Sequence, residues 1–120
     1  MRALVCGGRD YDDAAYMAEV LDEHHRIFGP ITTVIHGAAQ GADMLADAWA
    51  EAKGIPIDAY PANWIEHKKA AGPIRNQQMI DDGKPDVVIA FPGGRGTADM
   101  KARAKKAGIM LFTISPKPKE

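Results

Sequence analysis

The sequence predicts an α/β fold of three layers, in which helices cover both faces of a doubly wound, mainly parallel sheet of five strands. Short apolar runs rich in β-branched residues alternate with longer helical stretches along the chain. Strands that are separated by helices require parallel crossovers. The clearest run, Val87–Phe91, has no polar residue at alternate positions, which is typical of a strand that is buried on both faces.

Each element follows from local signals in the chain. The predicted strands are, in order, Arg2–Cys6, Thr32–Ile35, Ile55–Ala59, Val87–Phe91 and Ile109–Ile114. The predicted helices are a first one that Asp10, Asp12 or Asp13 caps and that ends near Phe28, followed by Met44–Lys53, Pro73–Gly83 and Ala98–Ala107. Glycine or proline marks most of the ends, since neither residue continues a regular element easily. We expect Tyr60–Gly72 to be an exposed loop with one helical turn.

The size and composition of the chain indicate a single domain. We expect its 120 residues to form one domain over 1–115, with 116–120 as a frayed tail. The net charge is −1, so no overall field attracts nucleic acid or an anionic membrane, and we expect neither as a partner. Cys6 is the only cysteine, which fits a reducing cytoplasm. No signal peptide and no apolar stretch of the ~20 residues needed for a membrane span is present, so we expect a cytoplasmic location.

The stretch after the fourth predicted strand is the strongest functional signal. Gly93-Gly94-Arg95-Gly96-Thr97 places three glycines in five positions between that strand and a helix. Glycine lets a ligand approach the backbone closely, and free N–H groups at a helix N-terminus attract phosphate or carboxylate. Arg95 would add a positive charge. The alternative is a turn that only reverses the chain, but the order of strand, glycines, hydroxyl and helix favours an anion site.

Two further turns of this kind follow the first and second predicted strands, at Gly7–Asp10 and Gly37–Asp43. Since the carboxyl ends of parallel strands meet at one edge of a sheet, we expect the three turns to converge there. The first turn lacks the spacing of a dinucleotide fingerprint, and the third lacks the lysine of a Walker A loop. The sequence therefore predicts a phosphate cradle of another design. No spacing of His and Cys residues suggests zinc, and we predict neither a metal nor a cofactor.

Four stretches carry a resemblance to a known family. They are Gly7-Gly8-Arg9, His36–Asp43, Arg75-Asn76 and Pro92–Thr97. They resemble the motifs of the SLOG superfamily, which joins the Smf/DprA DNA-processing proteins and the lonely-guy (LOG) phosphoribohydrolases, and the chain looks closest to the small YspA/YpsA-related members. The resemblance covers Leu4–Ile114 and implies a Rossmann-like sheet that binds a nucleotide or a nucleotide-derived ligand.

The turns and the resemblance together give the candidate site residues. Those for ligand or phosphate binding are Gly7, Gly8, Arg9, Gly37, Ala38, Gly41, Asn76, Gly93, Gly94, Arg95, Gly96 and Thr97. In LOG enzymes the last motif continues to a glutamate that, with the helix arginine, supports cleavage of the N-glycosidic bond of a nucleoside 5′-monophosphate. Met100 stands at that position here, so the candidate catalytic residues are Arg75, Asp99 and Asp43. A one-residue step turns a helical side chain by about 100°, so Asp99 does not automatically replace the glutamate.

Two hypotheses of function follow. The first is a nucleotide-binding sensor or ligand-processing module, and the alternative is a LOG-type phosphoribohydrolase. Asp43 is as suited to capping a helix as to a ligand role, and His36 is expected to satisfy a loop hydrogen bond. Trp64 is either a lid that stacks on a base or the anchor of an exposed loop. The apolar residues of Asp43–Lys53 exceed what one sheet face hides, which predicts a homodimer or a higher homo-oligomer.

Overall fold

The computed structural model describes residues 1–118, and the end of the predicted tail, residues 119–120, lies outside them. The protein forms one sheet of five strands in the order β3-β2-β1-β4-β5. Along the chain these are β1 (Arg2–Cys6), β2 (Thr33–His36), β3 (Ile57–Ala59), β4 (Val87–Ala90) and β5 (Met110–Thr113). All four strand pairs are parallel, which confirms the predicted fold class.

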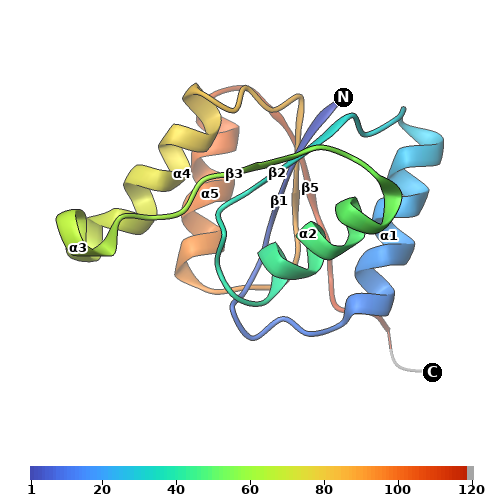
Figure 1. Ribbon diagram of the computed structural model, residues 1–120, viewed down its shortest axis with the longest axis horizontal. Helices are drawn as coiled ribbons and strands as arrows, with labels where there is room; N and C mark the ends of the chain where they lie inside the picture. The colour runs from blue at the N-terminus through green and yellow to red at the C-terminus, as the bar shows by residue number, and fades with distance from the viewer. Residues whose placement is uncertain (119–120) are drawn as a thin grey trace.

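Helices cover both faces of the sheet (Figure 1). They are α1 (Ala14–Ile27), α2 (Ala42–Lys53), α3 (Trp64–His67), the 3₁₀ turn η1 (Lys68–Ala70), α4 (Ala71–Asp81) and α5 (Arg95–Lys106). The helices α1 and α2 lie on one face and α4 and α5 on the other, while α3 projects beyond the body of the domain. Among the described residues, no helix is long and apolar enough to cross a membrane.

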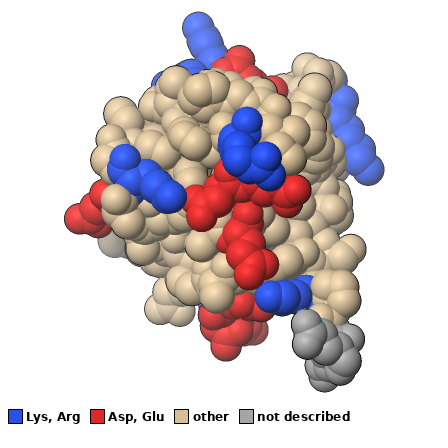
Figure 2. Space-filling model, turned by 90° about the vertical axis from the view of Figure 1, so that its right-hand side faces the viewer, with Lys and Arg blue, Asp and Glu red and all other residues tan. Residues whose placement is uncertain are grey.

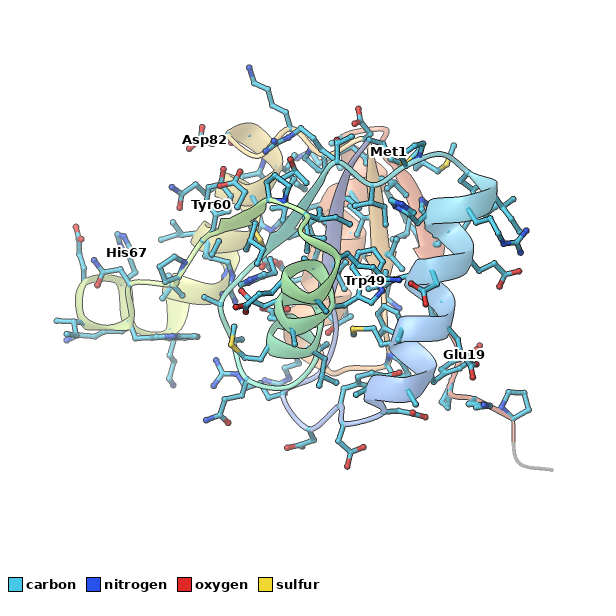
Figure 3. All side chains as sticks on the ribbon, turned by 45° about the vertical axis from the view of Figure 1, so that its right-hand side comes forward. Met1, Glu19, Trp49, Tyr60, His67 and Asp82 are labelled. Atoms are coloured by element: carbon cyan, nitrogen blue, oxygen red, sulfur yellow. The ribbon has the colours of Figure 1, made fainter. Side chains whose placement is uncertain are left out.

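The two faces of β1 bury separate cores. Ala3 and Val5 pack with residues of α1 and α2, whereas Leu4 and Cys6 pack with residues of α4 and α5. This is the period-2 alternation of a strand, and both faces are apolar because helices cover both. Trp49 belongs to the first core and lies between α2 and α1 in Figure 3, where its Nε1 donates to Asp22 Oδ1 at 2.9 Å.

Local signals placed most helix ends within a few residues. Asp13 caps α1, since its Oδ1 accepts from the N–H of Tyr16 at 3.0 Å. The helix α5 begins at Arg95 instead of Ala98, so the last three residues of the Gly93–Thr97 stretch belong to its first turn. The helix α4 begins at Ala71, two residues before Pro73, so the proline lies in its first turn. A proline is compatible with that position because the N–H groups of the first turn have no intrahelical acceptor.

The order of the strands reverses between β1 and β4. The chain passes from β1 through β2 to β3 on one side, and β4 and β5 continue on the other. In a doubly wound sheet, ligands bind outside the carboxyl ends of the strands at such a switch point. The turns that follow β1 and β4 are joined there, because the N–H of Gly8 donates to the carbonyl of Pro92 at 2.8 Å.

Candidate functional site

A cavity of about 980 Å³ lies at this switch point. Its walls come from the end of β1 and the turn after it, the turn after β4 with the first turns of α5, the N-terminal half of α4, and Trp64 of α3. The predicted residues that line it are Gly7, Gly8, Arg9, Asp43, Arg75, Asn76, Gly93, Gly94, Arg95, Gly96, Thr97 and Asp99. A concave site of this size is large enough for a small-molecule ligand.

The N-terminus of α5 opens into this cavity. Gly94 is its N-cap residue, and no side chain caps the helix within the described part of the chain. The first N–H groups of an α-helix have no intrahelical acceptor, and the helix dipole adds a partial positive charge to them. The N–H groups of Arg95, Gly96 and Thr97 therefore form a set of donors suited to an anion.

The glycines of the Gly93–Gly96 turn have two different uses. A Cβ atom at Gly93 would overlap the hydroxyl of Thr97 and lie 2.6 Å from the backbone nitrogen of Gly8, so close packing requires glycine there. A Cβ atom at Gly94 or Gly96 would meet nothing within 4 Å. These two glycines leave open space in front of the helix N-terminus, where a ligand could approach the backbone.

Three arginines line the same cavity. Arg75 reaches in from α4, and its guanidinium donates to the carbonyl of Gly37 at 2.5 Å and to Asn76 Oδ1 at 3.0 Å. Burial lowers the pKa of Arg75, but a guanidinium remains protonated at neutral pH. Arg9 lies over the ring of Trp64, with 5.3 Å between its guanidinium carbon and the ring centroid. Arg95 is exposed at the start of α5.

The two candidate catalytic carboxylates have opposite pKa shifts. Burial raises the pKa of Asp43, although its Oδ2 accepts from the N–H groups of Gly37 and Ala39, both at 3.1 Å. Burial also acts to raise the pKa of Asp99, but hydrogen bonds from Arg103 at 2.8 Å and Asn76 at 2.9 Å outweigh it and lower the pKa. A proton is therefore retained more readily at Asp43 than at Asp99.

The predicted residues Gly37, Ala38 and Gly41 do not line the cavity. From the same turn, Ala39 does. Gly41 has a φ of 76°, and a Cβ atom on it would overlap the carbonyl oxygens of Gly8 and Arg9. The N–H of the next residue, Ala42, donates to the carbonyl of Gly8 at 3.1 Å. The Gly37–Gly41 turn therefore packs against the backbone of Gly8 and Arg9 and stabilises the turn after β1.

His36 and Asn76 form hydrogen bonds that connect segments around the cavity. The Nδ1 of His36 accepts from the N–H of Ala38 at 3.0 Å and its Nε2 donates to Asp47 at 2.7 Å, which confirms the predicted loop hydrogen bond. Asn76 is buried and donates to the carbonyl of Gly96 at 3.2 Å and to Asp99 at 2.9 Å. Its carbonyl oxygen accepts from Arg75. The amide of Asn76 is thus fully paired and joins α4 to α5.

Several lining residues were not among the predicted site residues. They are Cys6, Asp10, Tyr11, Asp12, Ala39, Trp64, Lys69, Gly72, Pro73, Met79, Pro92 and Met100. The hydroxyl of Tyr11 is buried and has no hydrogen-bond partner within residues 1–118, and burial raises its pKa, so it remains a potential donor to a ligand. Burial raises the pKa of Cys6 to about 12, which excludes a thiolate nucleophile at neutral pH. Of these lining residues, Gly72 and Pro73 could have been predicted from the sequence, because they stand just before the candidate site residue Arg75.

Comparison with known proteins identifies the family. The family model described as "YspA, cpYpsA-related SLOG family" matches residues 1–67. A second match extends over the rest of the chain: the Gene 61 protein of Mycobacterium phage D29 is 39% identical over 126 residues, covering 98% of each chain. The chain belongs to the YspA, cpYpsA-related SLOG family. The resemblance that the motifs predicted is therefore confirmed.

The fold of this SLOG protein also occurs in a larger enzyme. The crystal structure of a UDP-N-acetylglucosamine 2-epimerase matches 95% of the chain with a TM-score of 0.61 and 17% sequence identity. The chain spans about a third of that protein's length, since 33% of it is covered. At this identity the match shows a shared α/β fold. Membership of the SLOG family and this fold both fit a module that binds a nucleotide-related ligand.

Within residues 1–118, no group of three or more His, Cys, Asp or Glu side chains is arranged to hold a metal ion. Figure 2 shows acidic side chains gathered on one face of the molecule, with lysine or arginine side chains beside them. Two acids of α1, Glu19 and Asp22, are paired with Lys117 and Lys53. The cations that surround the cavity lie in the turns and in α4 instead.

Proposed function

We propose that the protein binds a nucleotide or a nucleotide-derived ligand in this cavity, with a phosphate group at the N-terminus of α5. The observation that carries the proposal is the uncapped helix N-terminus, with open space at Gly94 and Gly96, facing a cavity that Arg9, Arg75 and Arg95 line. Backbone N–H groups would hold the phosphate oxygens, and the arginines would neutralise their charge. The unpaired hydroxyl of Tyr11 offers one further polar contact.

Such a protein acts as a sensor or carrier of its ligand. The cavity of about 980 Å³ has room for a base and a sugar beside the phosphate. Four cationic residues, Arg9, Lys69, Arg75 and Arg95, line the cavity, while the chain as a whole has a net charge of −1. This distribution favours a small anion over an extended polyanion such as DNA, which needs a basic surface.

Calorimetry with nucleoside mono- and diphosphates tests this proposal. Gly94→Val should abolish binding, because its side chain would fill the space next to the helix N-terminus, whereas nothing within 4 Å forces the fold to change. Ala102→Val is the matched control, since Ala102 is exposed on the same helix outside the cavity. Equal affinity of the two variants for every nucleotide would remove this site from consideration.

The alternative function is a LOG-type phosphoribohydrolase, and the position of the Asp43 and Asp99 carboxyl groups on the cavity wall with Arg75 favours it. Cleavage of an N-glycosidic bond passes through an oxocarbenium-like state, which needs a carboxyl group near the ribose or the attacking water. Arg75 would hold the substrate. Met100, which stands at the position of the family's glutamate, lines the cavity but is 1% exposed, so a glutamate there would be largely buried.

Chromatography of the products separates these two functions. A hydrolase releases free base from a nucleoside 5′-monophosphate, and Asp99→Asn or Asp43→Asn should lower that release sharply while binding survives. Arg75→Ala should weaken both, because loss of a charged hydrogen bond costs about 1.5–3 kcal/mol. Binding without base release from any nucleotide by the unaltered protein would eliminate the hydrolase and leave the binding module.

We also propose that the protein is a homodimer or a higher homo-oligomer. Trp49 is hidden within the chain, so the apolar surface that remains on α2 is chiefly Met44, which is 43% exposed. Further exposed apolar side chains outside the cavity include Ile27, Phe28, Ile57, Ile65, Ile74 and Met110. Apolar surface of this kind is often covered by another chain. Light scattering at micromolar concentrations tests this directly, and a monomeric mass throughout that range contradicts it.

A further inference from the structure

Trp64 is a large aromatic residue that lines the cavity and yet is 48% exposed. We propose that its ring is the platform on which the heterocyclic base of the ligand stacks, in the place that the Arg9 guanidinium takes in this structure. This inference rests on the proposed function, because it adds a base-binding part to the phosphate site at α5. It therefore identifies the ligand as one that carries a heterocyclic base.

The contact between Arg9 and Trp64 indicates what the ring accepts. A guanidinium is planar and delocalised, and its central carbon lies 5.3 Å from the ring centroid. A nucleobase is also planar and delocalised, and stacking on an aromatic side chain is a common way of binding it. A cation–π contact at an exposed site is weak, so a base can displace Arg9 from the ring.

The position of Arg9 couples the two ends of the cavity. Arg9 extends from the turn after β1, and the preceding residue, Gly8, donates its N–H to the carbonyl of Pro92 at 2.8 Å. The backbone of Arg9 is therefore held beside the turn that leads into α5. Once released from the Trp64 ring, its side chain has a phosphate group as an alternative partner at that turn.

The ring of Trp64 is held in place by its surroundings. Its Cη2 atom would lie 3.6 Å from a Cβ atom on Gly72, so the ring rests beside the first turn of α4. Asn63 caps α3, accepting from the N–H of Glu66 at 3.0 Å. The helix projects from the domain in Figure 1, and the labelled His67 marks its outer end in Figure 3.

Trp64 differs from its neighbour in a way that favours a ligand over a protein partner. Ile65 is 93% exposed and does not line the cavity, whereas Trp64 does. Lys69 lines the same wall as Trp64 and adds positive charge there. The cavity lining holds four basic and four acidic side chains, so the positive charge available to a phosphate group is local to single residues. A ring beside such a cavity suits a ligand that carries both a base and a phosphate group. Ile65 therefore supplies the matched control, because it shares the helix but not the cavity.

The experiment compares AMP with ribose 5-phosphate by calorimetry, since the two differ in the base. The unaltered protein should bind AMP more tightly. Trp64→Ala should weaken AMP binding by about tenfold or more and leave ribose 5-phosphate binding unchanged. Trp64→Phe should retain most of the AMP affinity, and Ile65→Ala should behave as the unaltered protein. AMP should also change the tryptophan fluorescence of a Trp49→Phe variant, in which Trp64 is the one remaining tryptophan.

The outcomes separate this inference from the proposed function. Equal binding of AMP and ribose 5-phosphate by the unaltered protein would overturn the platform and leave the phosphate site standing. Equal losses of both ligands in Trp64→Ala would show a structural role for the ring and would also overturn the platform. No binding of either ligand would overturn both the platform and the proposed function.

Discussion

Two glycine-rich turns of this protein have the same sequence signal and different structures. Gly37–Gly41 precedes α2 and Gly93–Gly96 leads into α5, and each follows a strand of the sheet. In the first turn, the carboxylate of Asp43 accepts two backbone N–H groups, and the N–H of Ala42 donates to the carbonyl of Gly8. Neither α2 nor α5 has a side-chain cap within the described residues, but all four residues of the second turn line the cavity, whereas the first turn contributes Ala39.

The difference shows how a glycine is used. Gly41 lets two segments of backbone pack closely, since a Cβ atom there would overlap the carbonyl oxygens of Gly8 and Arg9. Gly94 borders open space. The first turn therefore stabilises the fold, whereas the second is available to a ligand.

The largest effect is expected from Gly41→Ala. Its φ of 76° is unfavourable for alanine, and the added methyl group would overlap backbone atoms. We expect the free energy of unfolding to fall by about 3 kcal/mol. Gly94→Ala should change it by about 0.5 kcal/mol or less. Denaturation with urea measures both, and equal losses would show that the two turns do not differ.

The second effect concerns the carboxylate that holds the first turn. Asp43→Ala would leave the buried N–H of Gly37 and the part-buried N–H of Ala39 without an acceptor, and should cost about 1–3 kcal/mol of stability. Asp43→Asn is the matched variant, because its amide oxygen can accept both hydrogen bonds. Thermal unfolding of the two variants tests this. If asparagine destabilises the protein as much as alanine, the hydrogen bonds are not the cause.

The smallest effect is a change in pH dependence. Burial raises the pKa of Asp43 from its ordinary value of 3.8, so the folded protein binds more protons than the unfolded chain between 3.8 and the raised pKa. The contribution of Asp43 to the free energy of unfolding therefore falls as pH rises through that interval. Asp43→Asn should remove this contribution. Urea denaturation at several pH values measures the slope, and an unchanged slope in the variant contradicts the assignment.

Local patterns along the chain sufficed to predict the fold and the edge at which the cavity lies. Unbroken apolar strands such as β4 require helices on both faces, and helical crossovers make the sheet parallel. The roles of single residues depended on contacts between distant segments. Asn76 resembled a ligand-binding residue, yet its amide is paired with Gly96, Asp99 and Arg75. The use of Gly41 depends on the carbonyl groups of Gly8 and Arg9, which its local sequence does not reveal.

The role of Trp64 also could not be predicted from its local sequence. The residues around it predicted either a lid or the anchor of an exposed loop, because no periodicity fixes the position of such a short helix. Its ring contacts Arg9, which precedes it by more than fifty residues in the sequence, and lies beside Gly72. The contact between the turn that carries Arg9 and the helix α3 therefore determines which face of the Trp64 ring a ligand can reach.

The most direct test is a titration of the ¹⁵N-labelled protein with AMP, followed by the amide resonances of the two helix N-termini. We expect the amide signals of Gly94–Thr97 to shift more on binding than those of Ala42–Met44 in α2, of which Asp43 alone lines the same cavity. Inorganic phosphate should produce the same pattern at higher concentration, because the anion site requires no base. Shifts at the start of α2 with none at the start of α5 would contradict the claim that the open turn binds the phosphate.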